Sequence, residues 1–480
     1  MDLPTTSSTP LFHFISGSFR SLSLFLLAFD PVHRTVHHVQ TISTLGPHQY
    51  LATNQHKDRI FTTTWAEPPS LQSWALQRST TEPWRMSLLD QVPITATSSY
   101  IDIPAPFTYT YSVGGPTGEV HSIDETTGGF GKKTQEILFV PEADLPFADK
   151  TRVALRYGSH GVESTSTPSY SLTFVPVLGT NSIEVYSRDI DSGSLTHLCS
   201  TPSPRGAEAN DGPRHVKLHP NGKLLYCVTE HSNIVDIYEI TSQPTNVTIP
   251  FVLKHVDSRS MLPDHIDPKS LHDFRGDTLL LTPPTAARPS PDALFTTTRG
   301  RTSATRGWLS IFALDENGYF ETGNRGHAVE AVIRYETPTS GGKANAIDLL
   351  TKRKIPSSQE ESDGQGNAET DDQGNAETGS ESGTQPHKQV YLHSQSRANQ
   401  SHSDQTKIEE EEDEGVWILL TDDDEVTAAS GSSGVKILEW NGWGKDGVRV
   451  IAEWPVLGVD DAETNGEERM MGGSHTIWVV

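Results

Sequence analysis

The sequence is poor in cysteine and in long apolar runs. Its 480 residues contain two cysteines, Cys199 and Cys227, which are too few for a disulfide framework and do not have the spacing of metal ligands. The apolar run from Leu22 to Phe29 is far shorter than the roughly 20 residues that a membrane helix needs. The first ten residues have no basic segment of the signal-peptide type. We therefore expect a cytoplasmic protein without a membrane partner.

Positive charge is also scarce, because 37 Lys and Arg residues are set against 62 Asp and Glu residues. Fifteen acidic and three basic residues lie between positions 360 and 414, so about half of the formal net charge of -25 belongs to one segment. No run of Lys and Arg interleaved with aromatic residues marks a nucleic-acid groove, and a negative surface repels a phosphate backbone. The sequence predicts no nucleic-acid partner, and it leaves the oligomeric state open.

Short alternating apolar runs are abundant, and Gly, Pro, Asn, Asp and Ser clusters separate them. Helical periodicity is nearly absent. The runs repeat as a hydrophobic strand, a polar turn and a second strand that ends in an aromatic residue. Clear copies end at Tyr186 and Tyr238, fifty-two positions apart, and looser copies lie near Trp74, Phe312 and Trp440.

This period indicates an all-β propeller. A unit of about fifty residues with roughly four strands is what a propeller blade requires, since one blade cannot bury both of its faces alone. Six or seven such units fit the chain. An array of β-sandwiches is the alternative, but sandwich domains show no such fixed repeat.

The stretch from 352 to 414 interrupts the repeat. It contains QGNAET twice and ends in IEEEEDE. Its low apolar content and high net charge cannot offset the entropy of ordering, so it predicts a disordered acidic insertion within a single domain that spans residues 1–480. A solvated loop without catalytic consequence is the favoured interpretation, and a regulatory role is the alternative.

Two segments place ionisable residues beside turns. In GSHGVE, His160 lies between two glycines, which would leave its imidazole uncovered as a proton donor with a pKa near neutral; a structural turn histidine is the alternative. In DGPRHVKLHPNGKLLYCVTE, Arg214 opens a strand, and the turn at 220–222 returns the chain to Glu230. Arg214 and Glu230 should therefore lie near the same end of neighbouring strands, either lining a central funnel or forming an ion pair at a blade edge.

Two later segments add basic residues. Arg299 follows a buried type of strand in FTTTRGRTSATRG, and Arg214 and Arg299 together would clamp a carboxylate or phosphate, because guanidinium forks bind such groups with two hydrogen bonds. In TPTSGGKANA, a sharp Ser-Gly-Gly bend precedes Lys343 and Asn345. These residues indicate an anionic ligand but do not specify a reaction.

No cofactor or metal motif accompanies these residues. The acidic run from Asp422 to Asp424 lacks the ligand spacing of a calcium loop. The sequence has no Cys/His ligand set, no GxGxxG that opens a helix and no convincing GxSxG elbow. We therefore predict no cofactor and no metal site.

Several of these segments resemble the propeller family of lactonases that includes bacterial-type 6-phosphogluconolactonases and fungal carboxy-cis,cis-muconate cyclases. GPRHVKLHPNGKLLYCVTE is similar to a signature of both branches, whereas TPTSGGKANA, TDDDE…VKILEW and the terminal Gly-Gly…IWVV strand resemble the cyclase branch. The resemblance runs from about Leu11 to the C-terminus, with the acidic insertion as an interruption. It implies a seven-bladed β-propeller in which the N- and C-terminal strands share one blade.

The same resemblance implies a cofactor-independent isomerase that closes a small polycarboxylate, 3-carboxy-cis,cis-muconate, into a carboxymuconolactone in protocatechuate catabolism. His160, Arg214, Glu230 and Arg299 match the active-site residues of the family. His160 would be the general acid, the two arginines would hold two carboxylates, and Glu230 would orient an arginine or the imidazole. Lys343 stands where the cyclase-like motif has a histidine, and it would be a further anion contact.

Two other functions remain open at this stage. A phosphosugar lactonase would use the same arginines for a phosphate and the same histidine to assist the attack of water on a lactone. A non-catalytic propeller would be an interaction platform, because function resides in sites grafted onto a fold. The change at Lys343, and a segment 92–106 that does not reproduce the His- and Asn-rich loop of the cyclases, leave the substrate fit open.

Overall fold

The structure, a computed structural model, describes residues 10–168, 170–243, 251–321, 332–353, 412–430, 433–456 and 470–480. The chain divides into two compact units, of which the first comprises Met1–Lys352 with Glu412–Val480 and the second comprises Arg353–Glu411. The predicted acidic insertion, 352–414, lies almost entirely outside the described residues.

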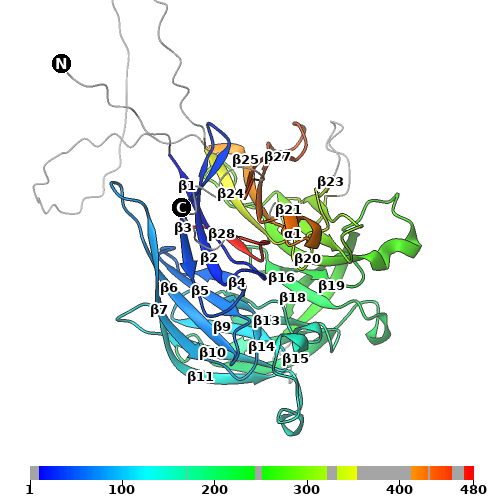
Figure 1. The fold of residues 1–480 in the computed structure, drawn as a ribbon. Coiled ribbons are helices and arrows are strands. Elements are labelled where there is room, and N and C mark those ends of the chain that lie inside the picture. Colours follow the sequence, from blue (N-terminus) through cyan, green and yellow to red (C-terminus); the bar gives the residue numbers. More distant parts are fainter. Residues whose placement is uncertain are drawn as a thin grey trace, which may run out of the picture. The chain divides into compact units, whose positions relative to one another are not determined.

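The first unit contains seven four-stranded sheets, here called blades (Figure 1). Blade 1 consists of β28 (Thr476–Trp478), β1 (Phe12–Ser16), β2 (Ser23–Asp30) and β3 (Thr35–Ser43). Blade 2 consists of β4 (His48–Thr53), β5 (Arg59–Thr64), β6 (Ser70–Gln77) and β7 (Arg85–Pro93). Blade 3 consists of β8 (Ser98–Asp102), β9 (Tyr109–Gly114), β10 (Thr117–Ile123) and β11 (Phe130–Leu138).

The other four blades follow the same order along the chain. Blade 4 consists of β12 (Glu163–Ser166), β13 (Ser171–Val177), β14 (Ser182–Arg188) and β15 (Leu195–Pro202). Blade 5 consists of β16 (Pro213–Leu218), β17 (Leu224–Thr229), β18 (Ile234–Ser242) and β19 (Phe251–Ser260). Blade 6 consists of β20 (Phe274–Leu281), β21 (Ala293–Gly300), β22 (Trp308–Ala313) and β23 (Val332–Glu336). Blade 7 consists of β24 (Ile347–Arg353), β25 (Glu412–Thr421), β26 (Val435–Trp440) and β27 (Arg449–Trp454).

Helices are few and short in the described part of the chain. They are η1 (Glu142–Asp144), η2 (Arg152–Arg156), η3 (Ala207–Ala209), η4 (Pro268–Asp273) and α1 (Glu425–Ser430). None of the described helices has the length and apolar character needed to cross a membrane. The prediction of an all-β chain is confirmed.

Each predicted repeat corresponds to the second and third strands of a blade. The runs that end at Tyr186 and Tyr238 form β13–β14 and β17–β18. In β17, Leu224 and Tyr226 face blade 6 whereas Leu225 faces blade 4, because successive side chains of a strand point to opposite faces. Both faces are buried, so the strand has a continuous apolar sequence.

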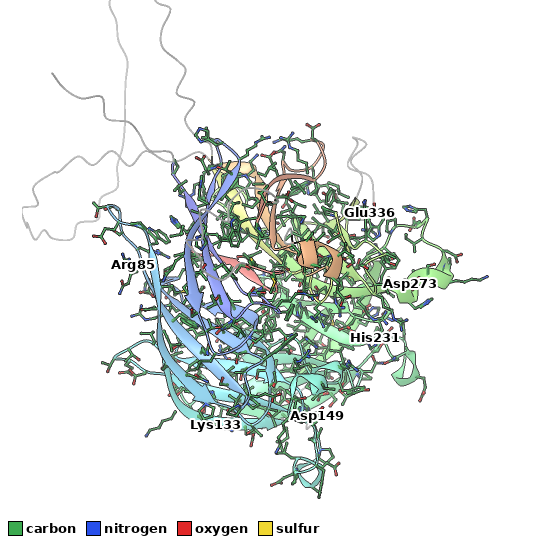
Figure 2. All side chains as sticks on the ribbon, in the orientation of Figure 1. Arg85, Lys133, Asp149, His231, Asp273 and Glu336 are labelled. Atoms are coloured by element: carbon green, nitrogen blue, oxygen red, sulfur yellow. The ribbon has the colours of Figure 1, made fainter. Side chains whose placement is uncertain are left out.

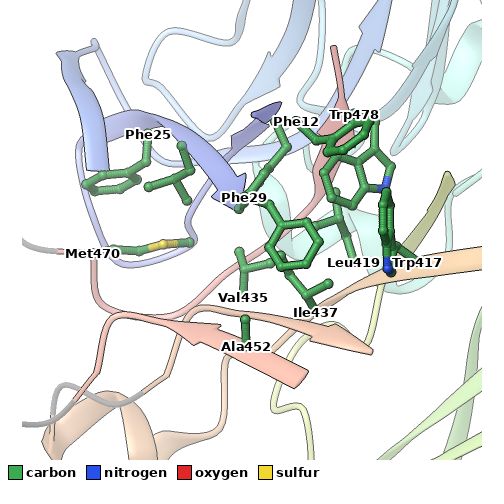
Figure 3. Packing of buried hydrophobic residues seen from close by; sticks show 12 residues of the cluster. Phe12, Phe25, Phe29, Trp417, Leu419, Val435, Ile437, Ala452, Met470 and Trp478 are labelled. Atoms are coloured by element: carbon green, nitrogen blue, oxygen red, sulfur yellow. The ribbon is translucent and has the colours of Figure 1, made fainter. Parts of the chain in front are cut away.

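Seven clusters of buried hydrophobic residues, one between each pair of neighbouring blades, complete the ring. The cluster between blades 7 and 1 packs Phe12 and Phe29 against Trp417 (Figure 3). In blade 1 the C-terminal β28 pairs with the N-terminal β1, and Phe14 lies opposite Trp478. The predicted seven-bladed propeller with both termini in one blade is therefore confirmed.

The first strand of each blade lies nearest the centre, and neighbouring first strands contact one another, as β4 contacts β8 and β16 contacts β20. Antiparallel pairing brings the start of each first strand to the end of the second strand. Pro213 thus lies opposite Thr229, and Phe274 lies opposite Gly300. Residues at these two positions of successive blades meet at one end of the central channel.

Candidate active site

The predicted site residues occupy these strand ends in blades 4 to 7. His160 precedes β12, Arg214 is the second residue of β16, and Glu230 directly follows β17. Arg299 is the penultimate residue of β21, and Lys343 precedes β24. The neighbouring loops are marked in Figure 2 by His231, after β17, and by Asp273, before β20. The topology thus brings these five of the six predicted residues to the same end of the channel.

Glu230 links the two predicted arginines. One carboxylate oxygen accepts a hydrogen bond of 2.6 Å from Nη1 of Arg214, and the other accepts one of 3.0 Å from Nη2 of Arg299. On its other side, Arg214 donates from Nε to Oδ1 of Asp277 over 3.0 Å. The side chains of Arg214 and Asp277 are buried, and 18% of the Arg299 side chain is exposed. Arg299 is therefore the more accessible of the two guanidinium groups.

The charge balance of this cluster keeps Glu230 ionised. Burial alone would raise the pKa of its carboxyl group, but Arg214 and Arg299 overcome this effect and lower the pKa to about 2. Arg214 has the carboxylates of Glu230 and Asp277 as partners, and its pKa is raised. The cluster is thus a permanently charged network at neutral pH.

His160 lies within the electrostatic reach of this network. Its Nε2 donates a hydrogen bond of 2.8 Å to the carbonyl oxygen of Leu155, in η2. Because a carbonyl oxygen only accepts, the proton of the neutral imidazole is on Nε2 and the lone pair is on Nδ1. Burial, reinforced by Arg214, lowers the pKa of His160 to about 3.

The expectation of an uncovered imidazole with a near-neutral pKa is wrong for the unliganded protein. His160 is 8% exposed, and η2 provides the carbonyl group that binds it. The flanking glycines serve close packing instead, because a Cβ atom on Gly161 would lie 3.0 Å from the carbonyl oxygen of Arg214. His160 is therefore neutral and desolvated before any ligand binds.

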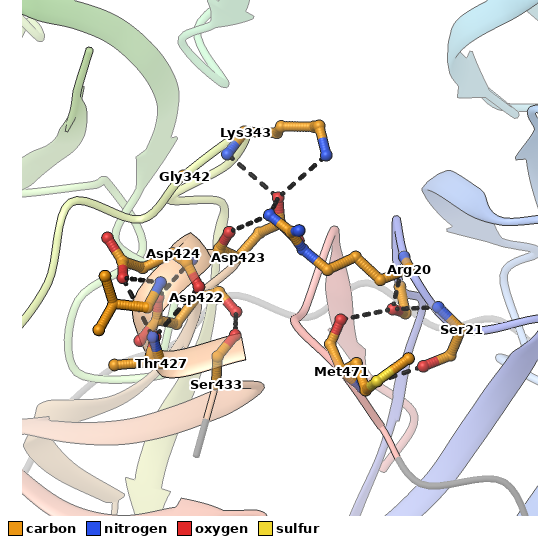
Figure 4. Close-up of polar contacts among 12 residues, drawn as sticks. Arg20, Ser21, Gly342, Lys343, Asp422, Asp423, Asp424, Thr427, Ser433 and Met471 are labelled. Carbon is orange, nitrogen blue, oxygen red and sulfur yellow. Dashed lines mark hydrogen bonds and ion pairs between the residues drawn. The ribbon is translucent and has the colours of Figure 1, made fainter. Parts of the chain in front are cut away.

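Lys343 belongs to a second charged group at the same end of the channel (Figure 4). Its Nζ lies 3.6 Å from Oδ2 of Asp423, and Nε of Arg20 donates to Oδ1 of the same carboxylate over 2.7 Å. The Lys343 side chain is 43% exposed. Next to it, Nη1 of Arg299 donates to the carbonyl oxygen of Gly342 over 3.5 Å, so the two charged groups are contiguous.

Asn345 lies behind this surface rather than on it. It is 1% exposed, its side-chain amide donates to the carbonyl oxygen of Thr298 over 2.9 Å, and its backbone N–H donates to Asp277 over 2.6 Å. These bonds hold the loop before β24 against β21. The structure thus places Asn345 as a positioning residue, and its direct contact with a substrate stays a prediction.

The acidic run before α1 is engaged by its own chain. Asp422 pairs with Nζ of Lys436 at 3.0 Å, and Asp424 accepts hydrogen bonds from Ser340 and from the first turn of α1. Together with the Arg20 bond to Asp423, these contacts give all three carboxylates partners within the described residues.

An aromatic pair completes the rim of the site. Phe19 and Trp65 stack with ring centroids 4.6 Å apart. The guanidinium of Arg152 lies 4.9 Å from the Trp65 ring, and Nζ of Lys343 lies 5.7 Å from the Phe19 ring. Since Arg152 opens the helix η2 that binds His160, the rim connects Lys343 back to His160.

Below this rim, the first strands provide aromatic and histidine side chains. Tyr50 stacks on Tyr100 at 3.9 Å and on His475 at 3.7 Å, and His215 meets both tyrosines edge-on. Burial lowers the pKa of His475 to about 3 and, together with Arg214, lowers that of His215 well below its usual value. These rings form an uncharged floor beneath the arginines.

A deeper ion pair lies below that floor. Lys217 pairs with Glu163 at 3.0 Å. Burial alone would lower the pKa of Lys217, but the negative charges of Glu163 and Asp102 overcome this effect and raise it above its usual value. Burial and the charge of Glu163 raise the pKa of Asp102 to about 7. Lys217, Glu163 and Asp102 thus form a further charged group, which is separate from the Arg214 cluster.

Four further residues at the site, Asp277, Arg275, Tyr100 and His475, are not predicted from the sequence. All four lie on first strands or directly before them, where polar residues face the channel and the apolar repeat is weak. A signal was nevertheless present: FRG at the start of β20 occupies the place that PRH occupies in β16, so that Arg275 aligns with Arg214. Aligning the blades on their first strands would have revealed it.

The fold and the site together define a class of protein. It is a seven-bladed propeller that holds an arginine-rich, carboxylate-balanced cluster and a buried neutral histidine at one end of its channel. Such a cluster can bind an anion with two or more carboxylate or phosphate oxygens, and it offers an adjacent imidazole for proton transfer.

Comparison with known proteins identifies the family. Residues 17–321 match the family described as lactonase, seven-bladed β-propeller. The chain is 28% identical over 337 residues to Muconate cycloisomerase 1 of Cutaneotrichosporon cutaneum, a match that covers 69% of this chain and 82% of that relative. It is 33% identical over 95 residues to 6-phosphogluconolactonase of Pectobacterium atrosepticum, which covers 19% of this chain and 26% of that relative. This chain belongs to the lactonase family of seven-bladed propellers.

The family membership confirms the resemblance that the sequence predicts. Among solved structures, the periplasmic gluconolactonase of Pseudomonas aeruginosa aligns with a TM-score of 0.51 and 15% identity, covering 71% of this chain and 86% of that chain. At this identity the likeness shows the fold alone. The enzymes among the sequence relatives support a catalytic activity of a lactone-related kind.

Proposed function

We propose that this protein is a cofactor-independent isomerase that converts 3-carboxy-cis,cis-muconate into a carboxymuconolactone in the catabolism of protocatechuate by the β-ketoadipate pathway. The observation that carries the proposal is the shared Glu230 carboxylate, which joins Arg214 and Arg299 in one buried cluster next to His160. The similarity to a muconate cycloisomerase along 69% of the chain supports the same choice.

The reaction is an intramolecular addition. A carboxylate oxygen of the substrate attacks one carbon of a conjugated double bond, the π electrons move to the neighbouring carbon, and that carbon takes up a proton. One C–O bond and one C–H bond form and no group leaves. The substrate trianion thus becomes a lactone dianion with uptake of one proton, and the balance requires neither an oxidant nor a reductant.

The arginines supply positioning and charge in this proposal. Arg299 presents a partly exposed guanidinium to one carboxylate, and Arg214, fixed by Glu230 and Asp277, adds a rigid positive charge beside it. Holding the attacking oxygen near its target carbon is the main catalytic device. The same charges stabilise the enolate-like anion that develops before protonation.

His160 is the proposed proton donor, and the substrate itself would make it one. The imidazole is neutral in the free protein because burial and Arg214 lower its pKa to about 3. A bound substrate trianion adds negative charge beside His160 and thereby offsets the charge of Arg214, which raises the pKa of the imidazole. Proton transfer from a correctly placed acid contributes about 10²–10⁴ to a rate.

A lactone hydrolase acting on a phosphosugar is the second candidate. The observation in its favour is the neutral His160 with a free lone pair on Nδ1, which suits a general base that activates water. The match to 6-phosphogluconolactonases over a short segment points the same way. A non-catalytic interaction platform is the third candidate, and it predicts no turnover at all.

The direction of proton exchange separates the first two candidates. In weakly buffered solution at pH 8 with an indicator dye, cyclisation takes up one proton for each diene lost, whereas hydrolysis of a lactone releases one. We expect loss of the diene absorbance of 3-carboxy-cis,cis-muconate with proton uptake in a one-to-one ratio. His160→Gln and Arg299→Gln should abolish both signals.

The matched control is Arg306→Gln. Arg306 lies in the loop after Arg299, its side chain is 57% exposed, and it pairs with the exposed Glu336. This variant should retain full turnover. Proton release from 6-phosphogluconolactone without any diene loss would replace the cyclase with the hydrolase, and inertness toward both substrates would favour the interaction platform.

A further inference from the structure

Two arginines lie directly opposite each other in blade 6, at the edge of the proposed site. Arg275 in β20 and Arg299 in β21 are Cα partners in the antiparallel register of these strands. Directly opposite residues point to the same face of a sheet, and like charges at such positions repel each other. The protein therefore keeps an unfavourable pair of guanidinium groups beside Glu230.

The surrounding carboxylates, Glu230 and Asp273, offset this repulsion only in part. Glu230 is shared between Arg299 and Arg214, and Asp277 is bound to Arg214. Among the residues that the structure describes, Arg275 has no ion pair. Its Nη1 donates to the carbonyl oxygens of His272, at 2.8 Å, and of Phe274, at 2.7 Å, which carry no charge.

Two further observations indicate a missing anion. Nε of Arg299 is buried and has no hydrogen-bond partner in the described part of the chain. Burial lowers the pKa of Arg275, and Arg299 and Arg301 add to this effect against the opposing charge of Glu230. An anion that accepts hydrogen bonds from both guanidinium groups would satisfy the free donor and remove the repulsion.

We propose that Arg275 and Arg299 together form a subsite for one carboxylate of the ligand, separate from the Arg214–Glu230 pair. The inference rests on the proposed function for the identity of the ligand, a polycarboxylate. Arg275 is half-buried and Arg299 is 18% exposed at its side chain, so the subsite is accessible. Arg275 thereby becomes a substrate-binding residue that the sequence motifs do not indicate.

Binding of an inert tricarboxylate tests the subsite without turnover. Propane-1,2,3-tricarboxylate is titrated into the wild-type protein and the Arg275→Gln variant, with calorimetry for the Kd and thermal denaturation for the ligand-induced rise in Tm. We expect the variant to bind at least ~10-fold more weakly and to lose most of the rise in Tm. Arg306→Gln, the exposed control in the next loop, should bind like the wild type.

A charge-preserving variant guards against a folding artefact. Arg275→Lys keeps the positive charge but loses the planar fork, so it should fold and still bind the tricarboxylate more weakly than the wild type. If Arg275→Lys and Arg275→Gln both bind with wild-type affinity, the subsite does not exist. If inorganic phosphate binds in an Arg275-dependent manner and the tricarboxylate does not, the carboxylate assignment is overturned in favour of a phosphate.

The outcome for the subsite is distinguishable from the outcome for the reaction. If the protein does not consume the diene, but Arg275→Gln still weakens tricarboxylate binding, the subsite stands and the cyclase fails. If the protein turns over 3-carboxy-cis,cis-muconate and Arg275→Gln leaves KM unchanged, the cyclase stands and the subsite fails. When both hold, Arg275→Gln raises KM at least ~10-fold with a smaller effect on kcat.

Discussion

At the scale of single residues, the balance of charge around Glu230 decides what the site can do. One carboxylate holds two arginines, and the imidazole of His160 lies within the field of all three. The field keeps Glu230 ionised, with a pKa of about 2, and His160 neutral, with a pKa of about 3. Neither group changes charge near neutral pH unless a ligand changes the field.

The state of His160 leads to a pH prediction. If His160 donates a proton, kcat/KM for the cyclisation should fall as the pH rises from 5 to 8, because the free protein must first take up a proton on a group whose pKa is about 3. The limiting slope is about tenfold per pH unit. The measurement is diene loss at substrate concentrations far below KM.

Two comparisons make this profile decisive. His33→Asn changes an exposed surface histidine and should leave the slope intact. A flat profile, or one that rises with pH in the wild-type protein, would identify His160 as a base and contradict its assignment as the proton donor.

The shared carboxylate leads to a second prediction. Glu230→Gln leaves the buried Arg214 and the partly buried Arg299 without the charge between them, so it should lower the free energy of unfolding by about 3 kcal/mol. Turnover should fall as well, because the arginines lose their fixed geometry. Urea denaturation gives the first quantity and diene loss the second.

Glu336→Gln is the matched control for this change. Glu336 pairs with Arg306 on the surface, with about half of each side chain exposed, so the loss of its charge should have almost no effect on stability. Equal stability of Glu230→Gln and Glu336→Gln would show that the Glu230 cluster is solvated and not a rigid network.

At the scale of elements, the loop before β24 joins the two charged groups of the site. Gly342 has a φ of +63°, and a Cβ atom there would lie 2.0 Å from the carbonyl oxygen of Asp423. The same residue accepts the hydrogen bond from Arg299. Gly342→Ala should therefore lower the Tm and raise KM, since it displaces both Lys343 and this carbonyl group.

Gly447→Ala provides the comparison for this prediction. A Cβ atom on Gly447 meets no atom within 4 Å, so this variant should keep the wild-type Tm and KM. Both values are measured by thermal denaturation and steady-state kinetics. If Gly342→Ala had the same Tm and KM as Gly447→Ala, the loop before β24 would not contribute to the site.

The elements also explain which parts of the fold the sequence predicts. The second and third strands, such as β17, are buried on both faces and therefore have long apolar runs that repeat in every blade. Some of the first strands are short and polar, such as β12, which is ESTS, and β8, which is SSYID. Their polar sequences resemble turns, which is why Tyr100 in β8 and Asp277 in β20 escaped prediction.

Burial at the site was not predictable from local sequence. GSHGVE indicates an open turn, yet η2 provides the carbonyl partner of His160 from the preceding segment. Arg214 and Glu230 were placed correctly because one hairpin connects their strands. Arg299 comes from the next blade, and the packing of blade 6 against blade 5 brings it to Glu230.

At the scale of the whole molecule, closure of the ring fixes the site. β28 joins β1 across the full length of the chain, and His475, directly before β28, stacks on Tyr50 beneath the arginine cluster. The seven interblade clusters then hold the first strands at fixed spacings. A site made of residues from four blades thus requires the complete propeller.

The buried histidines of the channel lead to a prediction for the stability of the entire protein. Burial lowers the pKa of His160 and His475 to about 3 and that of His48 to about 4, and it lowers that of His215 well below 6.5. In the unfolded chain each of them takes up a proton below about pH 6.5. The unfolded state therefore binds more protons between pH 6.5 and 4, and stability is lost as the pH falls through this window.

The expected slope is about 1.4 kcal/mol per pH unit for each such histidine. Urea denaturation at pH 7.5, 6 and 5 measures it, and His475→Gln should reduce the slope by one histidine, whereas the exposed control Arg306→Gln should not. Carboxylates with lowered pKa values, such as Glu230, contribute only below about pH 4.5, whereas Asp102, with its pKa raised to about 7, offsets the contribution of one histidine between about pH 7 and 4. A free energy of unfolding that stays constant from pH 7.5 to 5 would mean that the channel histidines are hydrated and charged, and the uncharged floor beneath the arginines would then be wrong.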